Sequence, residues 1–206
     1  MEDPYSTFYL LNLWHYIQPY DFWLIQKINQ DWSNSFFDTV LPYLRETRTW
    51  IPLYLFLIFF AVLNFGKKGW WWVFGVILTA AVADLVSSQL IKQTVMRLRP
   101  CQDPEVAPFL RFFVRYCPMS SSFTSSHATS HFAQASFFFY TLYPIMKKWG
   151  YVFFVWAASI AFTQVYVAVH YPFDVVCGAI LGTFLGWTIY QLYTRKCGKL
   201  SIDSIR

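Results

Sequence analysis

FTQVYVAVHYPFDVV, residues Phe162–Val176, lies among the most apolar residues of the chain, yet it carries an imidazole at His170 and a carboxylate at Asp174. Ionisable side chains at membrane depth are costly and usually serve a function. Tyr171-Pro172 predicts that one helix ends at His170 and that the next begins at Pro172, a favoured first helical position. Asp174 then lies in the first turn of the second helix, where the helix dipole favours a carboxylate. We therefore expect a sharp turn between two apolar helices that holds a His–Asp pair.

The composition places this turn in a membrane protein. Of the 206 residues, 56% are hydrophobic and only 13% are charged, which is too apolar for a soluble domain of this length. The net charge of +5 comes from basic residues scattered in short loops, without a recognisable nucleic-acid module, so no nucleic-acid partner is expected. The acidic start MEDPYST lacks the basic stretch of a cleavable signal peptide.

Apolar stretches long enough to cross a bilayer predict an all-α integral membrane protein with a bundle of about five transmembrane helices. These stretches are Thr49–Phe65, Gly69–Ile91, Ala128–Met146, Trp149–Val169 and Pro172–Tyr193. They form a predicted transmembrane domain over residues 49–194, followed by a cytoplasmic tail at 195–206. Residues 1–48 are too polar to span and are expected to form short interfacial amphipathic helices, with Tyr20–Trp32 and Ser35–Leu44 as candidates. A poorly formed sixth span is the alternative.

Positive charges assign the two sides of the membrane. Lysine pairs stand between the first and second and between the third and fourth apolar stretches, and a basic cluster follows the fifth. Their members are Lys67, Lys68, Lys147, Lys148, Arg195, Lys196 and Lys199. The positive-inside rule makes this side cytoplasmic. The N-terminus, residues 92–127 and the His170 turn are then extracytoplasmic, in what we expect to be the cytoplasmic membrane of a bacterium.

Cations are also in excess on the extracytoplasmic side, against the charge rule, and this indicates a site for an anion. In KQTVMRLRP, Lys92 and Arg99 are seven residues apart and would share one face of a helix that ends before Pro100. Two such cations suit a phosphate or a carboxylate. Asp84, Ser88 and Lys92 follow one another at i, i+4 spacing, so Asp84 either supports Lys92 from behind or joins two helices by a hydrogen bond.

The hydroxyl-rich run SSSFTSSHATSHF, residues 120–132, precedes an apolar helix and is typical of a helix N-cap. Free backbone N–H groups at such a helix start bind anions, and Ser125 and Ser126 would add hydroxyl donors. His127 is then close enough to an anion to pass it a proton. His127 and His131 have the i, i+4 spacing of a metal pair, but no third ligand follows. We therefore expect no metal, and a structural hydrogen bond for His131.

The His–Asp pair completes a third motif. Asp174 would fix the tautomer of His170 and leave the other ring nitrogen free to attack. The simpler alternative is that Asp174 only caps its helix and that His170 is an interfacial residue in a tight turn. All three motifs are predicted at one membrane face, and this favours the chemical interpretation.

Together the motifs resemble those of the membrane-bound type 2 phosphatidic acid phosphatase superfamily, whose site is shared with vanadium haloperoxidases. The family pattern is K-x6-R-P, P-S-G-H and S-R-x5-H-x3-D, and the resemblance covers about residues 50–190. The matching positions are Lys92 and Arg99-Pro100, then Thr124-Ser125-Ser126-His127, then Thr163-Gln164 with His170 and Asp174.

The resemblance implies a membrane lipid phosphatase that needs no metal or other cofactor. His170 would be the nucleophile that forms a phosphohistidine, Asp174 would orient it, and His127 would protonate the leaving group. The phosphoryl oxygens would be held by Lys92, Arg99, Ser125, Ser126 and the residue at Gln164. Phosphoryl transfer depends mainly on positioning and charge neutralisation, which these residues supply.

Gln164 departs from the family pattern, which has an arginine there to share the phosphate charge. Replacing a charged hydrogen bond by a neutral one costs roughly 1–1.5 kcal/mol, or about tenfold in rate. Three interpretations stay open: a natural variant in which Arg97, Arg111 or Arg115 substitutes, an engineered weakening, or a degenerate site. Arg111 and Arg115 also suit contacts with lipid headgroups.

Cys101 and Cys117 both fall in the predicted extracytoplasmic loop, where a disulfide is chemically favoured. Such a bond would stabilise the fold by roughly 3 kcal/mol in the chain-entropy model. Cys177 and Cys197 are expected to be free thiols.

The sequence thus predicts a phosphatase that hydrolyses a membrane lipid phosphate or diphosphate at the outer leaflet. Polyprenyl diphosphate such as undecaprenyl diphosphate, phosphatidylglycerol phosphate, phosphatidate and lipid A phosphates all fit. Two alternatives are a non-catalytic phospholipid-binding or translocating protein and a lipid-to-lipid phosphotransferase.

Overall fold

The computed structural model describes residues 4–114 and 116–200, and within these ranges it contains helices and loops and no strand. The α-helices are α1 (Pro4–Gln26), α2 (Ser35–Leu44), α3 (Ile51–Phe65), α4 (Lys67–Asp84), α5 (Lys92–Thr94), α6 (Ser126–Met146), α7 (Val152–Tyr166) and α8 (Pro172–Cys197). Shorter π and 3-10 segments connect them: η1 (Lys27–Asp31), η2 (Thr47–Trp50), η3 (Leu85–Ile91), η4 (Ala107–Phe109) and η5 (Lys147–Tyr151).

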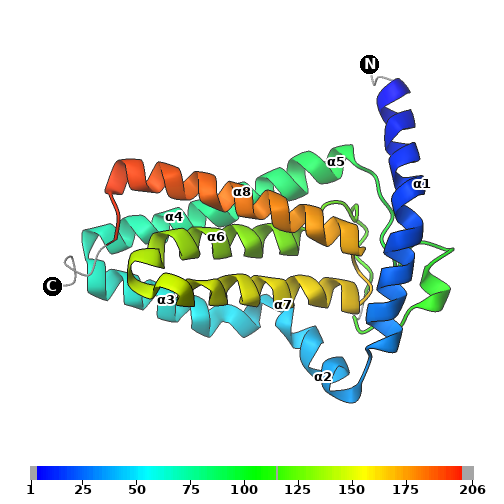
Figure 1. Cartoon of the computed structure of the whole chain (residues 1–206), viewed down its shortest axis with the longest axis horizontal. Coiled ribbons are helices and arrows are strands. Elements are labelled where there is room, and N and C mark those ends of the chain that lie inside the picture. The colour runs from blue at the N-terminus through cyan, green and yellow to red at the C-terminus, as the bar shows by residue number, and fades with distance from the viewer. Residues whose placement is uncertain (1–3, 115, 201–206) are drawn as a thin grey trace.

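The helices α3, α4, α6, α7 and α8 lie side by side as a bundle, and they correspond to the five predicted apolar stretches (Figure 1). This confirms the all-α membrane fold. By length and composition, Thr47–Phe65, Lys67–Thr94 and Pro172–Cys197 are apolar enough to cross a bilayer. The central helix α6 begins with polar residues, and α7 has 15 residues of regular helix, so the crossing of the membrane by these two helices stays a prediction.

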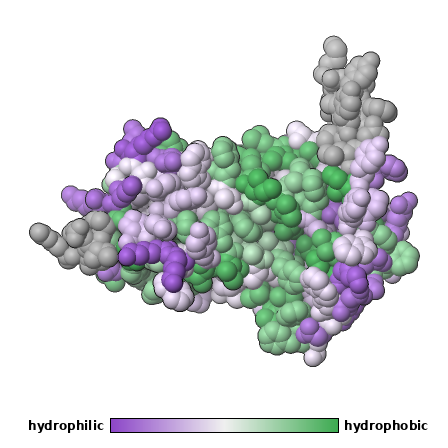
Figure 2. Space-filling view, viewed as in Figure 1, coloured by the Kyte–Doolittle hydropathy of each residue, from purple (hydrophilic) through white to green (hydrophobic). Residues whose placement is uncertain are grey.

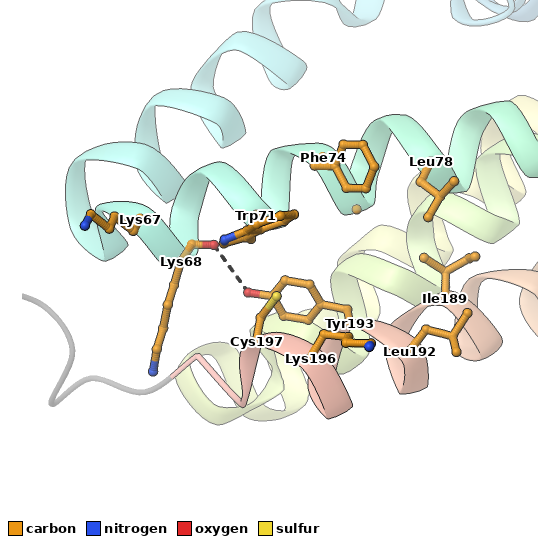
Figure 3. Close-up of a pocket in the computed structure, with 11 residues that line it drawn as sticks. Lys67, Lys68, Trp71, Phe74, Leu78, Ile189, Leu192, Tyr193, Lys196 and Cys197 are labelled. Atoms are coloured by element: carbon orange, nitrogen blue, oxygen red, sulfur yellow. Dashed lines mark hydrogen bonds between the residues drawn. The ribbon is translucent and has the colours of Figure 1, made fainter.

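The surface of the bundle fits this fold. Hydrophobic residues cover its middle, and hydrophilic residues gather at its two ends (Figure 2). One end holds the predicted basic loops: Lys67, Lys68 and Lys196 border a groove of about 570 Å³ between α4 and α8 (Figure 3). The walls of this groove are apolar, and no residue of the three motifs lines it.

The helices α6 and α8 approach each other at backbone distance, because α8 presents Gly178, Gly182 and Gly186 to α6. A Cβ atom at Gly182 would lie 2.2 Å from the carbonyl oxygen of Thr129, and one at Gly186 would lie 2.1 Å from that of Ala133. Small residues allow this contact in membrane helices. It fixes the two helices that begin with the His127 and Asp174 motifs, and the sequence analysis did not identify it.

The N-terminal segment differs from the prediction. Ser35–Leu44 is a helix as predicted, but the first helix starts at Pro4 and has 23 residues, so the expectation of a short helix was wrong. The helix is longer because it is held by tertiary contacts: Ile25 is fully buried, and the Trp14 ring lies 5.3 Å from that of Phe123. α1 runs across the end of the bundle instead of alongside its helices (Figure 1). An interfacial position of residues 1–48 stays a prediction.

We predict that Gly182→Ala destabilises the protein, because the added Cβ meets a backbone carbonyl of α6 that has no room to move. The expected loss is about 1–3 kcal/mol, measured as a lower unfolding temperature in detergent. Ile180→Ala, on the exposed face of the same helix, is the control. An equal unfolding temperature for Gly182→Ala and the natural protein would contradict the close contact.

Candidate functional site

The three motifs meet at one end of the bundle, where α6 and α8 begin and α7 ends. The segment that follows α5 and the serine-rich segment before α6 lie beside each other there: Arg97 N donates to Ser121 Oγ at 3.2 Å, and Ser122 N donates to Arg97 O at 2.8 Å. This pairing changes one expectation. The helix ends at Thr94 and the chain is extended at Val95, so Lys92 and Arg99 do not share a helical face.

Arg99 contacts the imidazole of His170 directly. Its Nη1 lies 3.0 Å from His170 Nε2 and 3.0 Å from the carbonyl oxygen of Val169. Its Nε and Nη2 donate to Ser120 and Ser121. A guanidinium has only donors, so His170 Nε2 must accept, and it therefore carries the lone pair. The proton of the neutral ring then lies on Nδ1.

The Nδ1 side of His170 faces Ser122 and Asp174. Ser122 Oγ donates to Asp174 Oδ2 and lies 3.4 Å from His170 Nδ1. The direct distance from Nδ1 to Asp174 Oδ2 is 3.9 Å, too long for a hydrogen bond. The carboxylate therefore acts on the imidazole mainly through the Ser122 hydroxyl. His170 is 2% exposed, and Ser122 and Asp174 are fully buried.

Asp174 is held by two further contacts. Its Oδ2 accepts from Tyr171 N at 3.1 Å, which closes a capping box at the start of α8, and its Oδ1 accepts from Arg97 Nη1. Arg97 Nη2 donates at 2.6 Å to Asp21, a buried residue of α1. The rings of Trp14 and Tyr171 lie 4.4 and 4.2 Å from the Arg97 guanidinium carbon. The Asp21–Arg97–Asp174 ion pairs thus join α1 to the motif.

The start of α6 has the predicted N-cap. Ser125 Oγ accepts from Ala128 N at 3.4 Å, and Ser125 N donates to Asp174 O, which ties the start of α6 to α8. His127 is half-buried in the first turn. His131 Nδ1 donates to His127 O at 2.8 Å and the ring packs against Trp156, so it has the expected structural hydrogen bond. No three His, Cys, Asp or Glu side chains of the described residues cluster as metal ligands.

Asp84 connects to the site through Ser88 and Ser126. Ser88 Oγ is 2.7 Å from Asp84 Oδ1 and 2.9 Å from Ser126 Oγ on α6. None of the ion pairs between described residues joins Asp84 to Lys92. Lys92 is nevertheless near enough to the carboxylates of Asp84 and Asp174, and to Arg99, for their charges to interact with its own. A supporting role of Asp84 stays a proposal.

Among the described residues, the Gln164 side chain makes no hydrogen bond to the other side chains of the site. It is fully buried, its Nε2 donates at 3.4 Å to Ile160 O in its own helix, and its Oε1 has no partner among the described residues. Two expected substitutes already have carboxylate partners: Arg97 pairs with Asp21 and with Asp174 of the site, and Arg111 pairs with Asp38 at 2.7 Å. Arg115, the third, lies outside the described residues.

Cys101 and Cys117 form the disulfide that the sequence analysis proposed, with their Cα atoms 6.0 Å apart. This disulfide closes the loop that contains η4, and its second cysteine lies just before the serine-rich run. Cys177 and Cys197 are free.

The sequence analysis missed Ser122, Asp21 and Arg45 as neighbours of the site. Ser122 stands in the hydroxyl-rich run, and this run was a usable signal. Asp21 is a buried acid on an otherwise apolar stretch, which signals a buried partner. Arg45 follows α2, and its charge acts on both Arg99 and His127. Nothing local in the sequence links either residue to the motifs, the first of which begins at Lys92.

Comparison with known proteins identifies relatives. The model of the PAP2 superfamily matches residues 68–197. A lipid A 4'-phosphatase of Bacteroides thetaiotaomicron is 29% identical over 174 residues, which is 83% of this chain and 76% of that protein. A lipid A 4'-phosphatase of Porphyromonas gingivalis is 24% identical over 148 residues, 70% of this chain and 61% of that protein.

Two solved structures share the fold. A transmembrane PAP2-type phosphatidylglycerolphosphate phosphatase from Bacillus subtilis has a TM-score of 0.65 and 22% identity, covering 95% of this chain and 98% of that one. LpxE of Aquifex aeolicus has a TM-score of 0.57 and 21% identity, covering 82% and 93%. At this identity the likeness concerns the fold alone.

We predict that Arg97→Gln destabilises the protein by about 3–5 kcal/mol, because it leaves two buried carboxylates without their cation. Thermal unfolding in detergent measures this. Arg111→Gln removes an ion pair whose arginine side chain is 44% exposed and should cost no more than about 1 kcal/mol. Equal losses of stability for the two substitutions would show that the Arg97 ion pairs do not stabilise the fold more than the exposed pair does.

We also predict a pH dependence of stability that comes from His170. Burial, and then the charges of Arg99 and Lys92, lower the pKa of His170 from 6.5 to about 3. Below about pH 6.5 the unfolded chain binds a proton that the folded protein does not, so stability falls as the pH drops towards 3. The unfolding temperature of the natural protein should therefore fall more steeply between pH 6.5 and 4.5 than that of His170→Gln. Parallel curves would show that His170 titrates normally.

Proposed function

The chain belongs to the PAP2 superfamily of membrane phosphatases, and from this premise we propose that it hydrolyses a lipid phosphate through a phosphohistidine on His170. One observation carries the proposal: His170 presents the lone pair of Nε2 beside the Arg99 guanidinium, while its Nδ1 side is held by Ser122 and Asp174. A buried, neutral and oriented imidazole beside a cation is what an attack on phosphorus requires.

In the first step, His170 Nε2 attacks phosphorus, and the bond from phosphorus to the leaving oxygen breaks. An incoming phosphoryl oxygen accepts the hydrogen bond from Arg99 Nη1, which in the free protein contacts His170 Nε2. Binding therefore frees the lone pair of Nε2, and the guanidinium neutralises part of the phosphate charge. As the bond forms, the ring becomes cationic, and Asp174 stabilises this charge through Ser122. Lys92 and the N-terminus of α6 with Ser125 and Ser126 hold the other oxygens.

His127 supplies the proton that the leaving oxygen needs. It stands in the first turn of α6, and an anionic phosphate beside it favours its protonated form. In the second step, water attacks the phosphohistidine, His127 takes a proton from that water, and the N–P bond breaks. Inorganic phosphate leaves, and both histidines return to their initial states.

The relatives suggest the substrate class. Both curated proteins named above are lipid A 4'-phosphatases, so we propose a phosphomonoester of lipid A as the substrate, removed at the extracytoplasmic face of a bacterial cytoplasmic membrane. The basic loops at the opposite end of the bundle support this sidedness through the positive-inside rule. No step as proposed requires a metal ion.

The proposal is tested by trapping the phosphoenzyme. Purified protein in detergent, mixed briefly with lipid A labelled with ³²P at the 4' position and quenched in alkali, should retain label that acid removes, as a phosphohistidine does. His170→Ala should retain none and should release phosphate at least about a thousandfold more slowly. His15→Ala, an exposed histidine in α1, is the matched control and should behave as the natural protein does.

A substrate panel separates the alternatives. It contains lipid A bisphosphate, undecaprenyl diphosphate, phosphatidylglycerol phosphate and phosphatidate. Turnover of any of these lipids that depends on His170 supports a phosphatase. The lipid that is hydrolysed fastest is then the preferred substrate of the panel. Lipid phosphate bound without turnover would support a binding or translocating protein, and label that passes to an added lipid alcohol would support a phosphotransferase.

A further inference from the structure

The site lacks one positive charge of the family pattern, because Gln164 stands where the third motif of that pattern has an arginine. Its amide is fully buried and is directed to its own helix. Arg97 and Arg111 do not replace that charge, since carboxylates already neutralise them. Of the lysines and arginines in the described residues that the motifs supply, a dianionic phosphoryl group would then meet Lys92 and Arg99, unless another element supplies a further cation.

The end of α2 brings Arg45 to this part of the molecule. Two hydrogen bonds fix the last carbonyls of α2: Trp50 Nε1 donates to Leu44 O at 2.7 Å, and Thr49 Oγ1 donates to Tyr43 O at 2.7 Å. The apolar side of α2 packs in the cluster that contains Ala128, in the first turn of α6, and Val169, next to His170. In Figure 1, α2 lies beside the end of α7 that leads into the His170 turn. Arg45 directly follows this anchored helix.

The charge of Arg45 acts on the groups that border the phosphate space. It acts on the guanidinium of Arg99, which touches His170 Nε2, and on the ring of His127. The side chain is half-buried, and burial lowers the pKa of its guanidinium below the usual value. Among the described residues it forms no ion pair and no side-chain hydrogen bond, although Glu46 is its neighbour in the chain.

Such an arrangement is unfavourable without an anion. A half-buried cation loses hydration, and the guanidinium of Arg99 also repels it. Glu46 and Tyr116 offset this only in part, because the pKa of the Arg45 guanidinium stays below its usual value. Exposed arginines such as Arg48 remain hydrated, and the buried Arg97 has two carboxylates. Among the described residues Arg45 has no carboxylate in direct contact, so the unfavourable energy would be recovered when a phosphate enters between Arg45, Arg99 and His127.

We infer that Arg45 binds a phosphoryl oxygen of the substrate and supplies the positive charge that is missing at Gln164. The inference rests on the proposed phosphatase function. It means that the N-terminal segment, which none of the three motifs includes, completes the phosphate site. The guanidinium adds to Lys92 and Arg99 as a third cation from a different direction, which suits the three equatorial oxygens of the transferred group.

The test compares Arg45→Ala with Arg48→Ala, which removes an exposed arginine three residues away. Binding of inorganic phosphate by calorimetry and turnover of lipid A bisphosphate are both measured on the full chain in detergent. Arg45→Ala should weaken phosphate binding about tenfold and lower kcat about 10- to 100-fold, whereas Arg48→Ala should change neither. Arg45→Lys should retain a larger part of both. Equal behaviour of Arg45→Ala and Arg48→Ala would overturn the inference.

Rescue separates a missing charge from a structural defect. Gln164→Arg should raise the turnover of Arg45→Ala by about fivefold or more, and should raise that of the natural protein less, because there the charge is already present. An equal gain in both backgrounds would overturn the substitution of one charge for the other. If Gln164→Arg does not fold, judged by its unfolding temperature, the difference between Arg45→Lys and Arg45→Ala decides.

The two proposals fail separately. Hydrolysis that depends on His170 but not on Arg45 would leave the phosphatase and remove the role of Arg45. Phosphate binding that depends on Arg45, without turnover of any lipid of the panel, would leave Arg45 as an anion ligand and remove the phosphatase.

Discussion

The buried carboxylate of Asp174 is the constraint on which this end of the molecule depends. A charge without solvent is tolerated only when it is fully compensated, and Asp174 receives a guanidinium, a hydroxyl and a backbone N–H. Each donor comes from a different part of the chain. Arg97 brings the segment after α5, Ser122 brings the serine-rich run, and Tyr171 forms the turn itself. Satisfying one carboxylate therefore assembles the elements that surround His170.

The second condition is the contact between α6 and α8. The glycines of α8 let its backbone touch that of α6, and the Ser125 N–H donates to the carbonyl of Asp174. The helix that carries His127 and the helix that carries Asp174 thus have little freedom to slide. The positions of His127 and His170, the proposed proton donor and nucleophile, are therefore set relative to each other by helix packing, since no hydrogen bond between described residues joins their two side chains.

The sequence was informative where the signal is local. The helix starts at Pro172 and after Ser125 can be predicted from neighbouring residues, and so can the apolar stretches and the basic loops. Together they lead to the correct fold and to the meeting of three motifs. The errors arose where distant residues compete with local rules. The helix stops at Thr94 and not before Pro100, because Arg97 pairs with Ser121 and Ser122. The partner of Arg97 in α1 is 76 residues away, so no pattern of spacing reveals it.

The position of α1 across the end of the bundle, with α2 beside the end of α7, has a consequence for the evolution of such sites. The part of the chain that matches the family model begins at residue 68, whereas Asp21 and Arg45 lie before it. The three motifs and these two residues, which lie near them in the fold, are therefore in separate segments of the chain. An N-terminal segment can accumulate changes, or be exchanged between relatives, and alter the charge at the mouth of the site while every motif residue stays the same. Differences in substrate among such proteins would then go with sequence differences in the segment that precedes the first motif.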